Sequence, residues 1–196
     1  MRALLFIFAM FVMLLLSGCS DLLSVQPLAT AETAVFDAGL IGEWSFAGGA
    51  PGGFEHSDIR DLRGVALIRA GSAQKKDYDI VWIPDEGEAL RLKGQLVKVG
   101  DRQVFDLIAV KKTDLAIPAH FFMLVEKTAD GVKFHWLDSE WLRSQVISQN
   151  GLAHAMVNDK PVITAGSAEI KAFLEKFGLD AQAASGSLSC KPVKRQ

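Results

Sequence analysis

Residues 89–110 read ALRLKGQLVKVGDRQVFDLIAV, and this stretch predicts two antiparallel strands joined by a tight turn. Apolar residues alternate with charged or amide residues on either side of Gly100-Asp101, which is a two-residue hairpin signal. Gly94, in the middle of the first strand, predicts a bulge or bend. The apolar faces of the two strands carry Leu90, Leu92 and Leu96, followed by Phe105, Leu107 and Ala109.

Similar patterns recur on both sides of this hairpin. Many short strands joined by hairpin turns are typical of an antiparallel meander, and a meander that curls into a barrel hides its edges. The fold class that we expect is therefore mainly β, a barrel-like meander with two peripheral helices near the C-terminus. The further strands are expected at 43–46, 65–69, 78–83, 119–127 and 132–137, with a small hairpin at 153–157 and 161–164.

The clearer of the two helices is expected to begin at Ser167, acting as its cap, and to end at Gly178. An apolar stripe with helical spacing follows Ser167. A shorter helix is expected from Ser139 to about Ser148. The stripe consists of Ile170, Phe173, Leu174 and Phe177.

The first eighteen residues have the order of a secretory signal. Arg2 precedes an apolar run of 14 residues, which is shorter than the roughly 20 that a membrane-spanning helix needs. The run ends in Leu16-Ser17-Gly18-Cys19, which resembles the lipobox of bacterial lipoproteins. That resemblance implies cleavage before Cys19 and acylation of this cysteine. Ser20, in place of aspartate, implies retention at the outer membrane, facing the periplasm.

Composition excludes several classes of protein. A formal net charge of −2 does not suit a nucleic-acid binder, and 49% hydrophobic residues do not suit a disordered chain. If Cys19 is acylated, Cys190 has no cysteine partner within the chain. We divide the chain into a signal peptide (1–18), a lipidated N-terminus and tether (19–38), a barrel-like domain with helices (39–180) and a C-terminal tail (181–196).

Gly42-Glu43-Trp44 opens the first expected barrel strand and is similar to the Gly-x-Trp motif of lipocalins. That resemblance implies that Trp44 plugs the closed end of an eight-stranded barrel, and that the barrel binds a small apolar ligand. Trp82 shares a strand face with Tyr78, and Trp136 shares one with Phe134. These aromatic residues either pack a filled core or line a hollow one, so no ligand-binding residue is assigned.

The histidines do not indicate a metal site. None of the four is spaced like a zinc-ligand pair on a helix. A turn at Asp130-Gly131 would place His135 opposite Glu126 as a polar cross-strand pair, roughly 20 Å from His120. No metal or other cofactor is implied.

Catalytic motifs are lacking as well. The chain has no Gly-x-Ser-x-Gly motif, and Glu55-His56-Ser57-Asp58 places an acid, a base and a hydroxyl side by side in a loop, unlike a triad assembled from distant segments. We expect a non-enzymatic, lipid-anchored protein that binds a small apolar ligand. Two alternatives are an envelope assembly module that binds another protein, and, more remotely, a hydrolase; the oligomeric state is left open.

Overall fold

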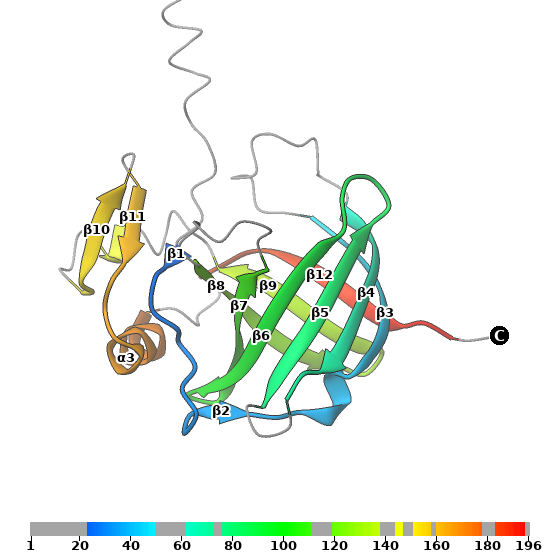
Figure 1. Ribbon diagram of the computed structural model, residues 1–196, viewed down its shortest axis with the longest axis horizontal. Helices are drawn as coiled ribbons and strands as arrows, with labels where there is room; N and C mark the ends of the chain where they lie inside the picture. The colour runs from blue at the N-terminus through cyan, green and yellow to red at the C-terminus, as the bar shows by residue number, and fades with distance from the viewer. Residues whose placement is uncertain are drawn as a thin grey trace, which may run out of the picture.

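A computed structural model describes residues 23–49, 62–72, 76–110, 119–137, 144–146, 151–157, 160–177 and 183–194 (Figure 1). Nearly all of its regular structure is β. The elements are β1 (Leu23–Ser24), β2 (Ala34–Val35), the 3-10 helix η1 (Ala38–Leu40), β3 (Gly42–Gly48), β4 (Leu62–Ala70), β5 (Asp77–Pro84), β6 (Leu90–Val99), β7 (Arg102–Ala109), β8 (His120–Thr128), β9 (Gly131–Leu137), β10 (His154–Val157), β11 (Lys160–Ile163), α3 (Ser167–Phe177) and β12 (Ala184–Pro192).

Eight of the strands form a closed antiparallel barrel. Strands β3 to β9 follow one another as an up-and-down meander, and β12 returns to pair with both β9 and β3. This confirms the expected fold class. The C-terminal segment was expected as a tail over 181–196 with, as the alternative, a short final strand at 187–190; the strand is present and longer, Ala184–Pro192, and it closes the barrel. Its inward side chains, Leu188 and Cys190, are buried in the interior.

The alternation in residues 89–110 is confirmed. Val99 pairs with Arg102, so Gly100-Asp101 is the two-residue turn, and Gly100 adopts the positive φ of 59° that such a turn favours. Of the bulge or bend expected at Gly94, the bulge is wrong, since Gly94 pairs in unbroken register with Tyr78 and with Leu107. A Cβ at position 94 would lie 2.9 Å from Cδ2 of Leu107 and 3.1 Å from the Phe105 ring, so the glycine makes room for both side chains.

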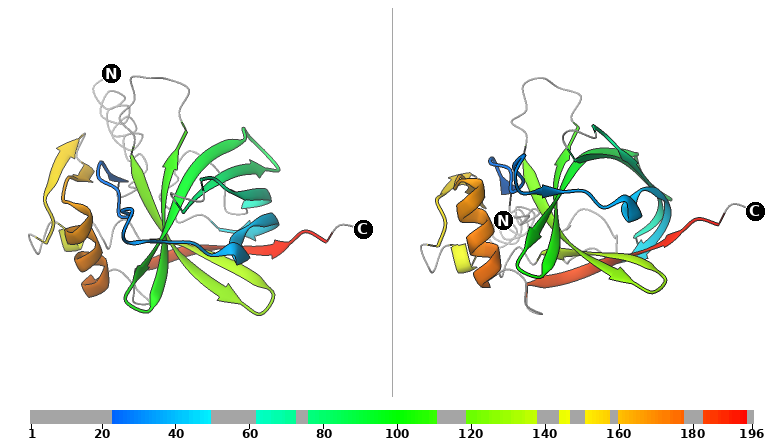
Figure 2. Two further views of the ribbon diagram at one scale, coloured as in Figure 1. Left: turned by 60° about the horizontal axis from the view of Figure 1, so that its bottom comes forward. Right: turned by 90° about the horizontal axis from the view of Figure 1, so that it is seen from below.

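A second apolar core lies outside the barrel. It covers the outward faces of β6, β7 and β8, which explains why residues 121–125 are apolar without alternation. Figure 2 shows α3 beside the barrel with the N-terminal segment between them. The helical stripe is confirmed: Ile170, Phe173 and Leu174 are buried, and Phe177 packs against them.

The N-terminal segment is not a free tether. Leu28 and Ala29 are buried in the outer core. β2 pairs with residues 96–97 of β6, directly after residue 95, where the pairing of β6 with β5 stops. The segment was expected as a tether whose apolar residues could pack back onto the domain, and residues 23–38 are indeed packed on it rather than free; residues 19–22 lie outside the described ranges. Within the part of the chain that is described, no helix is long and apolar enough to span a membrane.

Two expectations about the helices change. Gly166, rather than Ser167, occupies the cap position of α3, because its carbonyl accepts the hydrogen bond from Ile170 N. The hydroxyl of Ser167 donates to Pro27 O instead. The helix expected at 139–148 lies mainly outside the described residues. The described part of this range, residues 144–146, is helical.

The turn between β8 and β9 differs by one position from the expected one. Thr128 pairs with Gly131, so the turn residues are Ala129 and Asp130, and His135 stands opposite Leu124. Gly131 is needed for another reason: a Cβ there would lie 2.0 Å from the backbone oxygen of Cys190 on β12. The glycine therefore permits close approach of the closing strand.

Candidate binding site

The barrel interior contains a cavity with a wholly apolar lining. Each of the eight barrel strands contributes at least one of its twelve lining residues, and none of these carries a charge. The free volume is only about 40 Å³, which is a few times the minimum that holds one water molecule. A larger occupant must therefore displace side chains. The lining includes Phe46, Ala66, Ile68, Phe105, Leu188 and Cys190.

A row of aromatic rings crosses the barrel above this cavity. Trp82 on β5 stacks on Trp136 of β9, with ring centroids 6.0 Å apart, and Trp136 stacks on Phe121 of β8 at 6.5 Å. The three rings are only partly buried. They are inward residues near the end where β5, β7 and β9 finish and β6, β8 and β12 begin, which we call the mouth end. The row separates the cavity from the mouth end.

The opposite end is closed by the segment 34–40. It runs across the bottom of the barrel (Figure 2, right), where Val35 and Leu40 join the interior cluster. The Trp44 ring is buried inside this end and its Nε1 donates to Leu40 O at 3.0 Å. Gly42 is at the start of β3, and a Cβ atom added there would lie 3.5 Å from the indole nitrogen of Trp44.

Polar contacts hold this closed end in place. Asp37 N donates to the hydroxyl of Tyr78 at 2.7 Å, and the Asp37 carboxylate pairs with Lys127 at 2.5 Å. Burial raises the pKa of Tyr78, because the phenolate would lose its hydration inside the protein. The closed end is thus tied to β5 and β8 from opposite sides.

No protein-family model, curated protein or solved structure matches this chain. The site is therefore interpreted from its own residues and geometry.

Cys190 faces the cavity and is 4% exposed. Burial raises the pKa of its thiol from 9.0 to about 12. Because the thiolate is the reactive form, this environment makes the thiol inert rather than nucleophilic. Among the described residues it is a free cysteine.

The native protein is expected to react with iodoacetamide at Cys190 about a thousandfold more slowly at pH 8 than a free thiol with a pKa of 9, because the thiolate is that much scarcer. Unfolding in guanidinium should restore the ordinary rate. Mass spectrometry of the quenched Cys190 peptide measures both rates. Equal rates in the native and unfolded protein would contradict a buried Cys190.

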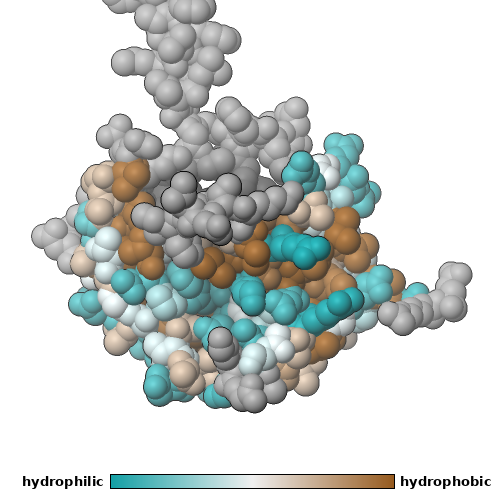
Figure 3. All heavy atoms as spheres, viewed as in Figure 1, coloured by the Kyte–Doolittle hydropathy of each residue, from teal (hydrophilic) through white to brown (hydrophobic). Residues whose placement is uncertain are grey.

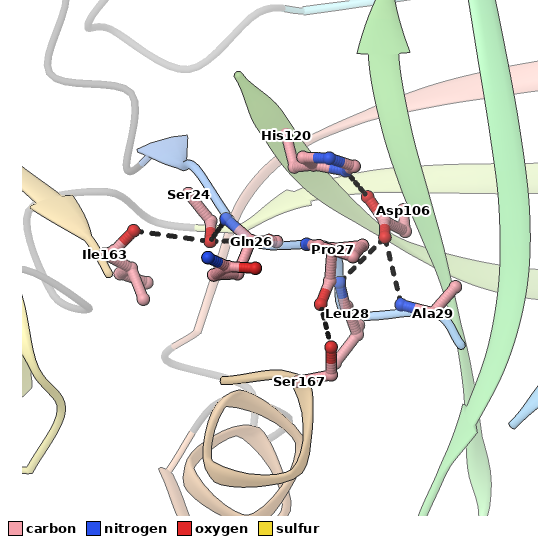
Figure 4. A network of polar contacts seen from close by, with 9 residues as sticks. All are labelled: Ser24, Gln26, Pro27, Leu28, Ala29, Asp106, His120, Ile163 and Ser167. Atoms are coloured by element: carbon pink, nitrogen blue, oxygen red, sulfur yellow. Dashed lines mark hydrogen bonds and ion pairs between the residues drawn. The ribbon is translucent and has the colours of Figure 1, made fainter. Parts of the chain in front are cut away.

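A buried carboxylate fastens the N-terminal segment to the barrel wall (Figure 4). Asp106 on β7 is 4% exposed, and its Oδ2 accepts from Leu28 N at 2.8 Å and Ala29 N at 3.0 Å. Its Oδ1 lies 2.6 Å from Nδ1 of His120. Both carboxylate oxygens are thus engaged in a site from which water is largely excluded.

Two serines extend this attachment. The hydroxyl of Ser167 donates to Pro27 O at 2.6 Å and so ties α3 to the segment. The buried hydroxyl of Ser24 donates to Gln26 O at 2.7 Å and accepts from Gln26 N at 3.1 Å. Asp106 therefore holds Leu28 and Ala29 on the barrel, Ser167 ties the segment to α3, and the Ser24 hydrogen bonds fix the turn within the segment.

The other residues singled out in the sequence have separate places. His135 contacts Glu126 at 2.7 Å, which confirms the polar pair, and this hydrogen bond lowers the pKa of Glu126. Among the described residues, no three His, Cys, Asp or Glu side chains could share a metal ion. Cys19 and residues 55–58 lie outside the described ranges.

Asp106 was not among the residues that the sequence pattern indicated. Its signal is an acid between the apolar residues Val104 and Ile108 on the outward face of the strand, where the apolar neighbours indicate a covered surface. Alternation in the strands predicts which residues face the barrel interior. It does not predict the cavity, because the pattern does not say which side chains leave space between them.

Proposed function

We propose that this protein is a non-enzymatic lipoprotein that binds a small apolar molecule inside its barrel. In this proposal the acyl chains on Cys19 hold it at the outer membrane, facing the periplasm. The order of charge, apolar run, small residues and cysteine at the N-terminus supports the anchor. Several acyl chains give stable attachment, whereas one gives only reversible binding.

The observation that carries the proposal is the apolar cavity beneath the row of rings. A cavity whose exposed lining surface is entirely apolar selects for hydrocarbon, because any polar group placed there would lose its water without compensation. The row of Phe121, Trp82 and Trp136 is the part that must move, since it lies between the cavity and the mouth end. An unbranched chain suits the narrow space best, with its polar head left at the mouth end.

Native mass spectrometry of the protein, extracted gently from its own membranes, tests the proposal directly. A bound molecule of defined mass that is lost on denaturation supports it. The protein is then titrated with dodecanol, and binding is followed by tryptophan fluorescence. Displacement of the Trp82 and Trp136 rings should change the fluorescence, because it changes their environment. Absence of any bound mass, together with no fluorescence change up to the solubility limit of dodecanol, would contradict the proposal.

The variant Ala66→Val should bind dodecanol about tenfold more weakly, because two methyl groups enter a space that the ligand needs. Ala47→Val is the matched control, since Ala47 lies on the neighbouring strand and is exposed. The affinities are compared by tryptophan fluorescence. If both variants bind as tightly as the unaltered protein, the ligand does not occupy the cavity.

A further inference from the structure

Exposed apolar side chains gather at the mouth end. Among the described residues, seven large hydrophobic side chains are more than a third exposed, and two of these, Phe36 and Ile41, flank η1 at the closed end. The other five belong to β10, to the ends of β5 and β7, and to the start of β6. They are Ile83 (47%), Leu90 (42%), Val110 (49%), Met156 (54%) and Val157 (51%).

The fold places these five at the same end of the molecule. Figure 1 shows the end of β10 and the β5–β6 turn at the upper side, together with the end of β7. Figure 3 shows hydrophobic surface over the β10–β11 hairpin and again on the side of β4 and β5. Large exposed apolar side chains that collect at one end, rather than being scattered singly, mark a contact surface.

The N-terminal segment enters the fold at this same end. Ser24 of β1 pairs with His120, the first residue of β8, and Leu23 pairs with Val162 of β11. Cys19 precedes Leu23 by four residues, so its backbone lies within about 14 Å of β1. A lipid on Cys19 would therefore hold the mouth end, and not the closed end, near the bilayer.

The attachment of residues 23–29 limits rotation about the anchor. Leu23 and Ser24 pair with β11 and β8, and the contacts of Asp106 and Ser167 hold residues 27–29, so the chain is fixed to the fold from the fourth residue after Cys19 onward. A long flexible tether would allow any face of the barrel to meet the membrane. Because Leu23 comes only four positions after Cys19, the mouth end is the part of the barrel that can reach it.

We propose that the mouth end of the barrel rests on a zwitterionic phospholipid surface, with Ile83, Leu90, Val110, Met156 and Val157 in contact with lipid. The inference rests on the acyl anchor proposed for Cys19. Asp85, Glu86 and Glu88 of the β5–β6 turn are exposed at this end and outnumber the exposed Arg63 and Arg91 at the starts of β4 and β6, so an anionic surface is disfavoured. In this orientation an apolar ligand passes between bilayer and barrel without crossing water.

An environment-sensitive NBD fluorophore attached at position 156 reports contact with lipid. The acylated protein with Met156→Cys and Cys190→Ala is inserted into the outer leaflet of phosphatidylcholine–phosphatidylethanolamine vesicles. The label should be reduced by dithionite at least fivefold more slowly than a label introduced by Ile41→Cys, which lies at the closed end. Adding anionic phosphatidylglycerol should diminish this protection.

Equal reduction rates at the two positions would overturn the proposal, and so would protection at position 41 alone. Protection at position 156 that persists in the Cys19→Ser protein without vesicles would mean that a second copy covers this surface. The mass of the N-terminal peptide is measured in the same sample. A peptide without acyl chains would refute the proposed anchor itself, and the dodecanol titration remains a separate test of the cavity.

Discussion

Replacing Asp106 with alanine is expected to lower the free energy of unfolding by about 3 kcal/mol, because buried hydrogen-bonding groups lose their partner. The change leaves the backbone N–H groups of Leu28 and Ala29 without an acceptor and removes the carboxylate that faces His120. Urea denaturation measures the loss. Amide exchange at Leu28 and Ala29 should accelerate more than exchange in β3 to β5, because the segment is released from the barrel.

Two further variants separate the causes. Asp106→Asn keeps an oxygen that accepts from the two backbone N–H groups. It should lower the free energy of unfolding by only about 1 kcal/mol, because the asparagine side chain has the same shape and retains this acceptor. Asp79→Ala removes an exposed carboxylate whose nitrogen partner on Lys93 is 3.7 Å away, so it should change stability by less than about 0.5 kcal/mol. A loss as small as this in Asp106→Ala would contradict the role assigned to Asp106.

Gly131→Ala is expected to destabilise the protein by about 3 kcal/mol, because the added methyl group has no room. Its Cβ would lie 2.0 Å from the backbone oxygen of Cys190, and backbone cannot move aside as a flexible side chain does. The β9–β12 seam must therefore open. Denaturant unfolding measures the destabilisation, and faster amide exchange in β12 locates it.

Gly100→Ala is the matched control for this substitution. Nothing lies within 4 Å of a Cβ at position 100, and the residue only needs a φ of 59°. The change should cost about 1 kcal/mol, the usual penalty of a left-handed conformation for a residue with a side chain. If the two variants lose equal stability, backbone conformation rather than close approach explains the glycine at 131.

Local patterns in the sequence were sufficient for the meander. The alternation on both sides of Gly100-Asp101 predicts β6, β7 and the turn between them, because side-chain direction in a strand depends only on neighbouring residues. The stripe from Ile170 to Phe177 predicts α3 for the same reason. The apolar interior follows from the inward faces of these strands.

Local patterns did not predict contacts between segments that are distant along the chain. The buried apolar side chains described on β12 are Leu188 and Cys190, and the strand pairs with β3, which lies far away along the chain. The turn at Ala129-Asp130 was misplaced by one position because Gly131 serves the approach of β12, a contact that no neighbouring residue reveals.

The sequence by itself determined the mainly β class, the order of the hairpins, the apolar stripe of α3 and the predicted anchor at Cys19. These features depend on side chains close together along the chain. The tertiary structure alone decided which strand closes the barrel, that Leu28 and Ala29 are held by Asp106, and that a small apolar cavity remains beneath the row of rings. These features arise from packing between segments that meet only when the chain has folded.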